Sequence, residues 1–157
     1  MAETKADSAA LGDSPSHLLH RASQCAGDIF GSEMERSKFD VTPRQLAILI
    51  AIEANPNGSQ TTLVEATGVD RSTLADIMRR IVKKGWAQRR RTKADARAYA
   101  VNLTASGKQV LERGSPALSS IDRKMLEPLS ATERKSFIKA LTTIVETMDK
   151  LGSKATG

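Results

Sequence analysis

The order of short periodic segments between residues 59 and 103 constrains this fold more than any other feature of the sequence. Two short helical patterns, residues 59–68 and 70–85, begin at the cap-like Ser59 and at Asp70 as N-cap, and they are separated at Gly68, a residue type that ends helices. Two strand patterns follow, residues 86–92 and 97–103, around the polar turn KADA. In the second strand, Tyr99, Val101 and Leu103 alternate with smaller or polar residues. This order predicts a helix-turn-helix followed by a β-hairpin, which is a winged helix.

Helical patterns flank this middle segment, which is too short to form a large core alone. Residues 16–37 carry apolar side chains at helical spacing, and Thr104 is a good N-cap for another helix. Pro116 lies in that second pattern and predicts a kink or break, because proline lacks the backbone donor. Ser130 and Glu133 have the spacing of a capping box before the last helix. The last helix has an apolar stripe made of Phe137, Ala140, Leu141, Ile144, Val145 and Met148.

The expected fold class is therefore mainly α, with a small β-hairpin wing and helices on both sides. We expect a disordered tail at residues 1–15, an N-terminal helix at 16–40, and a winged helix-turn-helix domain at 41–103. C-terminal helices follow at 104–151, and a short tail at 152–157. The apolar stripes of the flanking helices need partners.

Positive charge is concentrated in the middle segment. The chain of 157 residues has a net charge of +6, but residues 70–97 alone hold ten basic and three acidic residues, a net charge of +7. Such a block is typical of a surface that binds a polyanion, although an ordinary solvated basic face looks the same. The single cysteine excludes an intrachain disulfide, and the start of the chain lacks the apolar core of a signal peptide. We therefore expect a cytoplasmic protein without a membrane partner.

The second helix of the pair has the two faces of a DNA-reading helix. At about 100° per residue, Leu74, Met78 and Ile81 share one face, and polar and basic side chains lie opposite. The apolar face can pack on the preceding helices while the other face enters a major groove. An ordinary amphipathic surface helix would give a similar pattern. The residues predicted to contact DNA from this helix are Arg71, Ser72, Thr73, Ala75, Asp76, Arg79, Arg80 and Lys83.

The hairpin strengthens the prediction of DNA binding, because a basic wing can reach the phosphate backbone and the adjacent minor groove. Arginine is favoured in a narrow minor groove, where the negative potential is concentrated. Asp95 precedes Arg97 by two residues, and its carboxylate is placed to orient that guanidinium. The residues predicted to contact DNA from the wing are Arg90, Arg91, Lys93, Asp95 and Arg97.

Several motifs resemble those of the MarR family, the multiple-antibiotic-resistance regulators with a winged helix-turn-helix. The resemblance covers roughly residues 16–150, and its most specific part is the Asp-x-Arg step at Asp95 and Arg97 followed by Leu-Thr-x-x-Gly at 103–107. It implies an obligate homodimer whose first and last helices interleave, with two winged helices on a palindromic operator. It also implies transcriptional repression relieved by a small molecule, with Arg97 in the minor groove and Asp95 as its brace.

Asp76 departs from the resemblance, because members of the family often have a basic residue at this position. A carboxylate repels phosphate but can accept a hydrogen bond from cytosine N4. We expect Asp76 to restrict the choice of sequence rather than to strengthen binding. Unchanged relative affinities for operator variants after Asp76→Ala would contradict this.

The first helix contains the residues that suggest an effector or a sensor. His17, His20 and Arg21 are candidates for binding an aromatic carboxylate or a phenol. The two histidines lack the further ligands of a metal site, so neither a metal nor a cofactor is expected. Cys25 raises the alternative of a redox-responsive regulator, but it lies on the apolar stripe and we expect it to be packed.

Other classes of function compete with a ligand-responsive repressor. An enzyme has little support, because the sequence has no glycine-rich phosphate loop, no nucleophile elbow and no carboxylate pair near a histidine. A nonspecific or architectural DNA-binding protein would lose its binding to excess random duplex, whereas a specific regulator would not. A winged helix that binds only proteins would lack the salt dependence of phosphate contacts.

Overall fold

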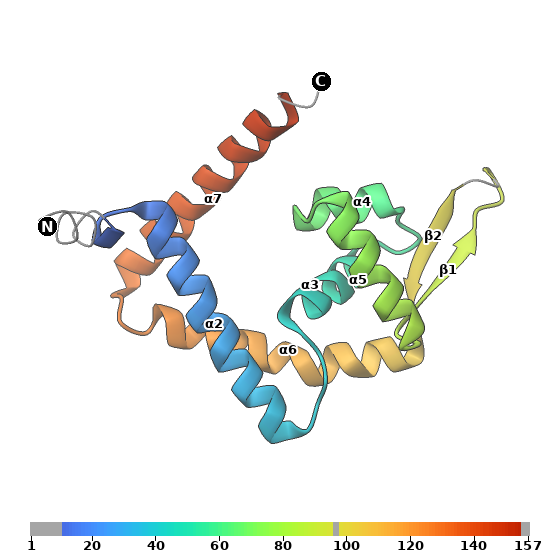
Figure 1. The fold of residues 1–157 in the computed structure, drawn as a ribbon, viewed down its shortest axis with the longest axis horizontal. Coiled ribbons are helices and arrows are strands. Elements are labelled where there is room, and N and C mark those ends of the chain that lie inside the picture. Colours follow the sequence, from blue (N-terminus) through green and yellow to red (C-terminus); the bar gives the residue numbers. More distant parts are fainter. Residues whose placement is uncertain (1–10, 96–97, 155–157) are drawn as a thin grey trace, which may run out of the picture. The chain divides into compact units, whose positions relative to one another are not determined.

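The computed structural model describes residues 11–95 and 98–154 and contains mostly helices with one two-stranded antiparallel sheet (Figure 1). The expected mainly α fold class with a β-hairpin is confirmed. Two compact units divide at Pro43, so that α2 lies in the first and the later elements lie in the second. The elements are α2 (Pro15–Ser37), α3 (Pro43–Ala54), α4 (Gln60–Thr67), α5 (Arg71–Lys83), β1 (Ala87–Arg91), β2 (Tyr99–Leu103), α6 (Ala105–Leu126) and α7 (Ala131–Lys154).

Side-chain caps fix where several helices begin, and the caps expected from the sequence are confirmed. Ser59 and Asp70 are the N-caps of α4 and α5, and Thr104 is the N-cap of α6. Before α7, the Glu133 carboxylate accepts from the Ser130 N–H at 2.8 Å, and the Ser130 hydroxyl accepts from the Glu133 N–H at 3.3 Å. These hydrogen bonds hold the pKa of Glu133 below its usual value.

The core of the second unit is aliphatic and joins the helices to the hairpin. α3 supplies a group of fully buried side chains, and α5 contributes Leu74, Met78 and Ile81 on the face predicted to be apolar. Val101 brings β2 into the same core. Because α4 contacts α5 and α5 contacts β1, α5 and the hairpin are held in one unit. The buried side chains of α3 are Gln45, Leu46, Ile48, Leu49, Ala51 and Ile52.

The Leu-Thr-x-x-Gly segment forms the joint between the hairpin and α6. The Thr104 hydroxyl donates to the Gly85 carbonyl at 2.6 Å and accepts from the Gly107 N–H at 3.0 Å. The Thr104 N–H donates to the Trp86 carbonyl at 3.1 Å. A Cβ at position 107 would overlap that same carbonyl oxygen, so only glycine lets α6 approach the start of β1 this closely.

The two predicted strands pair as an antiparallel hairpin, and a third segment joins its far edge. Arg89 pairs with Val101, and Arg91 pairs with Tyr99 across the antiparallel ladder. On the other side of β2, the Val101 N–H donates to the Gly58 carbonyl at 2.9 Å. The wing is therefore tied at its base to the turn between α3 and α4.

Two expectations about the flanking helices need correction. Of the kink or break expected at Pro116, the break does not occur, since α6 runs through this proline between buried Gly114 and Ala117. Cys25 was expected to be packed, but it is exposed in the single chain, as is Leu18 on the same stripe. The N-terminal half of the α2 stripe is thus left uncovered within one protomer.

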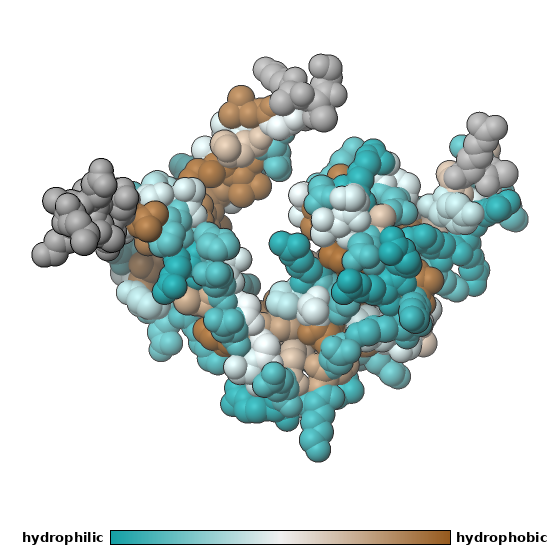
Figure 2. Space-filling model, in the orientation of Figure 1, coloured by the Kyte–Doolittle hydropathy of each residue, from teal (hydrophilic) through white to brown (hydrophobic). Residues whose placement is uncertain are grey.

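The last helix, α7, exposes most of its apolar residues to solvent, as the hydrophobic strip along it in Figure 2 shows. Val145, Met148 and Leu151 are each more than half exposed, at 56%, 60% and 58%. An apolar strip of this kind on one helix needs a partner surface. None of the helices within residues 11–95 and 98–154 has the length and apolar content to cross a bilayer.

Candidate nucleic-acid interface

The outer face of α5 is the centre of the candidate interface. Burial of Leu74, Met78 and Ile81 fixes the rotation of the helix about its axis, so the opposite face must look outward. The basic side chains predicted to read DNA are accordingly exposed, while Thr73, Ala75 and Asp76 are half-buried. The exposed members of the predicted set are Arg71, Ser72, Arg79, Arg80 and Lys83.

Asp70 ties the first turn of α5 together and engages two of the predicted DNA contacts. Its carboxylate accepts from the Thr73 N–H at 2.9 Å and from the Ser72 hydroxyl at 2.7 Å. The Thr73 side chain and backbone, followed by the Ser72 hydroxyl, hold the pKa of Asp70 far below its usual value. Ser72 and Thr73 therefore stabilise the start of α5 in the protein without DNA.

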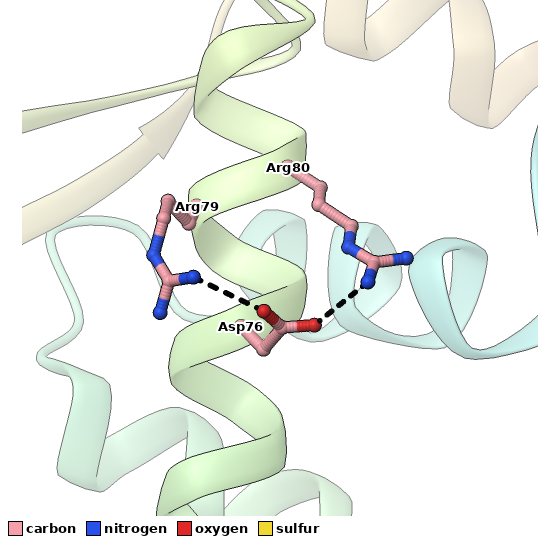
Figure 3. Close-up of polar contacts among 3 residues, drawn as sticks. All are labelled: Asp76, Arg79 and Arg80. Atoms are coloured by element: carbon pink, nitrogen blue, oxygen red, sulfur yellow. Dashed lines mark hydrogen bonds and ion pairs between the residues drawn. The ribbon is translucent and has the colours of Figure 1, made fainter.

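Asp76 forms ion pairs with both arginines of the middle of α5. Its Oδ1 lies 3.1 Å from Nη1 of Arg79, and its Oδ2 lies 3.1 Å from Nη2 of Arg80 (Figure 3). The spacings of three and four residues place all three side chains on the same face. These pairs are solvent-exposed, so each adds only about 0.3–0.5 kcal/mol to the stability of the helix. Their main consequence is the orientation of the two guanidinium groups.

The strand register separates the basic side chains of the wing. Because side chains alternate along a strand, Arg90 points to one face of the hairpin and its neighbour Arg91 points to the other. The Arg91 guanidinium carbon lies 5.9 Å from the centroid of the Tyr99 ring across the ladder. Both arginines are exposed.

The tip of the wing is organised by Thr92 and Asp95. The Thr92 hydroxyl donates to the Asp95 carbonyl at 2.8 Å and accepts from the Asp95 N–H at 3.2 Å. Lys93 lies between them and is exposed. Arg97, the predicted minor-groove residue, lies outside the described residues, so its role beside Asp95 remains a prediction.

Sequence reasoning missed a group of amide side chains at the base of the wing. The Asn57 N–H donates to Oδ1 of Asn102 at 3.0 Å, and Nδ2 of Asn102 donates to Oδ1 of Asn57 at 2.9 Å. Both residues line a concavity of about 480 Å³, together with Gln88 and Arg90. The Asn57-Gly58 turn was visible in the sequence, but its partner lies 45 residues away.

The residues proposed for an effector lie apart from this interface in the sequence, on the first half of α2. His17 is half-buried, whereas His20 and Arg21 are exposed. In the second unit, a mainly apolar concavity of about 440 Å³ lies between α3 and α6, where Ile50 and Leu111 are among its lining residues. In the part of the chain that the structure describes, no three His, Cys, Asp or Glu side chains cluster as a metal site requires.

Comparison with known proteins places the same residues in a family. The model of the MarR family matches residues 39–98. The transcriptional regulator HosA of Escherichia coli O157:H7 is 33% identical over 108 residues, which cover 69% of this chain and 80% of HosA. The repressor NicR of Pseudomonas putida is 28% identical over 136 residues, covering 87% of this chain and 85% of NicR.

A solved structure agrees over most of the chain. The structure of BpsR from Bordetella bronchiseptica superimposes on this chain with a TM-score of 0.78. The DNA binding of BpsR is regulated by 6-hydroxynicotinic acid. The two sequences are 26% identical, and the match covers 85% of this chain and 94% of BpsR. The similarity therefore includes the helices on both sides of the winged helix.

Proposed function

Because the chain belongs to the MarR family of winged helix-turn-helix transcriptional regulators, we propose that it is a homodimeric repressor of a palindromic operator, released by a small ligand. The observation that carries the proposal is the exposed basic face of α5 beside a basic hairpin in the same unit. The α5 face would read bases in the major groove, and the wing would follow the backbone into the minor groove.

The proposed contacts divide into those that read base edges and those that position the protein on the phosphate backbone. Arg79 and Arg80 are suited to guanine, because a guanidinium can donate to O6 and N7 together. Arg90 and Lys93 are exposed on the wing and suit phosphate contacts that carry no sequence information. We propose that Arg97 enters the minor groove and that the Asp95 carboxylate orients its guanidinium.

The proposed dimer is supported by the uncovered apolar strip on α7. Phe137, Ile144 and Val145 are 37%, 46% and 56% exposed, which is unfavourable for a helix with no partner. Pairing of α7, together with the uncovered half of the α2 stripe, would bury these side chains against a second copy. A dimer would also place two reading helices about 34–36 Å apart, one turn of DNA.

The proposed effector is a small aromatic acid or phenol. BpsR, which this chain resembles along most of its length, has its DNA binding regulated by 6-hydroxynicotinic acid. We propose His17, His20 and Arg21 as candidate ligand contacts. A thermal-shift screen tests this: an aromatic acid that binds should raise the melting temperature and release DNA, and a panel without any such compound would contradict it.

Recovery of genomic fragments with the purified protein tests DNA binding itself. With excess random duplex present, a specific regulator should retain a few fragments, with affinity about 10³-fold or more above background. Binding should also weaken steeply as salt rises, because each phosphate contact releases counterions. Equal recovery of all fragments would favour an architectural protein, and salt-independent or absent binding would favour a protein-interaction module.

A redox-responsive regulator is a second candidate, which requires that Cys25, exposed in the protomer, stays accessible in the dimer. An accessible thiolate can be oxidised, whereas a packed cysteine is inert. Mild peroxide should then release the protein from DNA, and Cys25→Ser should abolish that response. Unchanged DNA binding after peroxide treatment would exclude this candidate.

A further inference from the structure

We propose that Asp76 is a positioning residue that holds Arg79 and Arg80 for base reading and so weakens binding to sequences outside the operator. The proposal rests on the proposed function, because it assigns a role within the reading face of α5. It differs from a direct role in reading cytosine, since Asp76 acts here through the two arginines.

The geometry supports this positioning role. We call the Asp76 carboxylate with its two ion pairs, to Arg79 and Arg80, the brace. Each oxygen of the Asp76 carboxylate meets a different guanidinium at 3.1 Å, so the two arginines lie on either side of the aspartate (Figure 3). All three belong to one helix whose rotation is fixed by buried residues. The brace is therefore presented on the face that would meet DNA.

The brace leaves both arginines able to bind a base. A guanidinium has five N–H donors, and each ion pair engages a single nitrogen of its arginine. The remaining donors suit the paired acceptors of guanine. An arginine held in one direction can reach only a base edge that lies there, whereas an unbraced arginine can turn toward any nearby phosphate.

Charge gives the brace a second effect on specificity. The three side chains together carry +1, whereas the two arginines without Asp76 would carry +2. Attraction to phosphate depends on charge and not on sequence, so Asp76 lowers the affinity for every duplex. The loss is larger on random duplexes, where the arginines would bind phosphate, than at the operator, where they bind bases, so the ratio of operator to random binding rises.

The alternative, acceptance of a hydrogen bond from cytosine N4, makes a different demand on the side chain. It needs an acceptor oxygen, which asparagine also has, but not a negative charge. The brace needs the negative charge, which glutamate has and asparagine lacks. Asp76→Asn, Asp76→Glu and Asp76→Ala together therefore separate the two roles.

The test uses a pool of duplexes with a random core of about 20 base pairs, which spans two half-sites one turn apart. The wild-type protein selects its preferred duplex, and the affinities of all variants for that duplex and for the unselected pool are then measured over a range of salt concentrations. Asp122→Asn on α6 is the matched control, because it removes the same charge from an exposed site on another helix. Thermal unfolding of each variant checks that it folds.

We expect Asp76→Asn to lower the ratio of selected to unselected binding about tenfold, chiefly through tighter binding to the pool. Its salt dependence should steepen by about one phosphate contact per protomer. Asp76→Glu should restore both quantities toward wild type, because glutamate also pairs with arginines three and four residues away. Asp122→Asn should change the ratio by less than about twofold, because distant exposed charges are screened.

The outcomes separate failure of the inference from failure of the proposed function. A wild-type protein that enriches no sequence contradicts the proposed function, and the inference falls with it. If the wild type enriches a sequence but Asp76→Asn keeps its ratio and salt slope, the inference alone is wrong. If Asp76→Ala loses the preference for cytosine at one position and Asp76→Asn keeps that preference, Asp76 reads the cytosine directly. That result would overturn the brace.

Discussion

At the scale of single residues, Asp70 shows how one side chain links the stability of α5 to the presentation of its predicted DNA-binding face. Its role as N-cap followed from its place before an amphipathic pattern. The engagement of Ser72 and Thr73 by the same carboxylate did not, because the sequence cannot say which way a hydroxyl turns. In the same way, the sequence placed Asp76 on the outer face but did not show its pairing with both Arg79 and Arg80.

The lowered pKa of Asp70 predicts a pH-dependent contribution to stability. The charged carboxylate is favoured in the folded state, so its contribution is complete above the unfolded-state pKa near 4 and is lost as the pH falls toward the lower folded-state pKa. Asp70→Asn keeps an acceptor but removes the charge. The urea midpoint of the wild type should exceed that of Asp70→Asn at neutral pH, and the difference should shrink below about pH 4. A difference that does not depend on pH would contradict this account of the cap.

The wing arginines should differ in what their loss changes. Arg90→Ala should weaken binding to all sequences about equally and reduce the salt slope by about 1, as expected for a phosphate contact. Arg97→Ala should lower affinity sharply and reduce the preference for A·T-rich flanks. Binding to operators with different flanks, measured at several salt concentrations, checks both, with Arg123→Ala on α6 as the control. A uniform loss in Arg97→Ala would exclude minor-groove reading.

At the scale of elements, the boundaries that depend on local chemistry could be predicted and the contacts between elements could not. The caps at Ser59, Asp70 and Thr104 are set by short side chains acting on nearby backbone, which a sequence shows directly. The continuity of α6 through Pro116 depends on packing on both sides of the proline, which a local rule ignores. The pairing of Asn57 with Asn102 needs the tertiary fold.

The joint between the hairpin and α6 should tolerate no side chain at position 107. Gly107→Ala would push a methyl group into the backbone carbonyl of Trp86, and backbone cannot rotate aside as a flexible side chain can. We expect a loss of about 1–3 kcal/mol in the free energy of unfolding. Ser106→Ala, at an exposed neighbouring site of the same helix, is the control for the helix itself. Equal urea midpoints for the two variants would show that the joint can relax.

At the scale of the whole molecule, the proposed dimer explains why α7 has an apolar strip that the described part of its own chain does not cover. The apolar strip on α7 was visible in the sequence, but a stripe does not say whether its partner is the same chain or another copy. Within the described residues the strip stays largely exposed, which favours a partner outside the chain. If that partner is a second copy, a palindromic operator and a spacing of one DNA turn between the two α5 helices are expected.

Disruption of the strip should therefore separate the protomers. Ile144→Asp places a charge in the proposed interface, and sedimentation should show a shift from dimer to monomer together with weaker operator binding. Thr143→Asp is the control, because it adds the same side chain at the adjacent position. There the Thr143 hydroxyl donates to the Lys139 carbonyl of α7 itself. A dimer that survives Ile144→Asp unchanged would place the interface elsewhere.

The most direct test of the central claim is a hydroxyl-radical footprint of the wild-type protein on a fragment that it recovers from genomic DNA. A symmetric dimer with one reading helix and one wing per protomer predicts two equivalent protected regions, related by a two-fold axis and centred about 10 base pairs apart. A single protected half-site, or protection spread evenly along the fragment, would contradict the claim that two copies of α5 read one operator together.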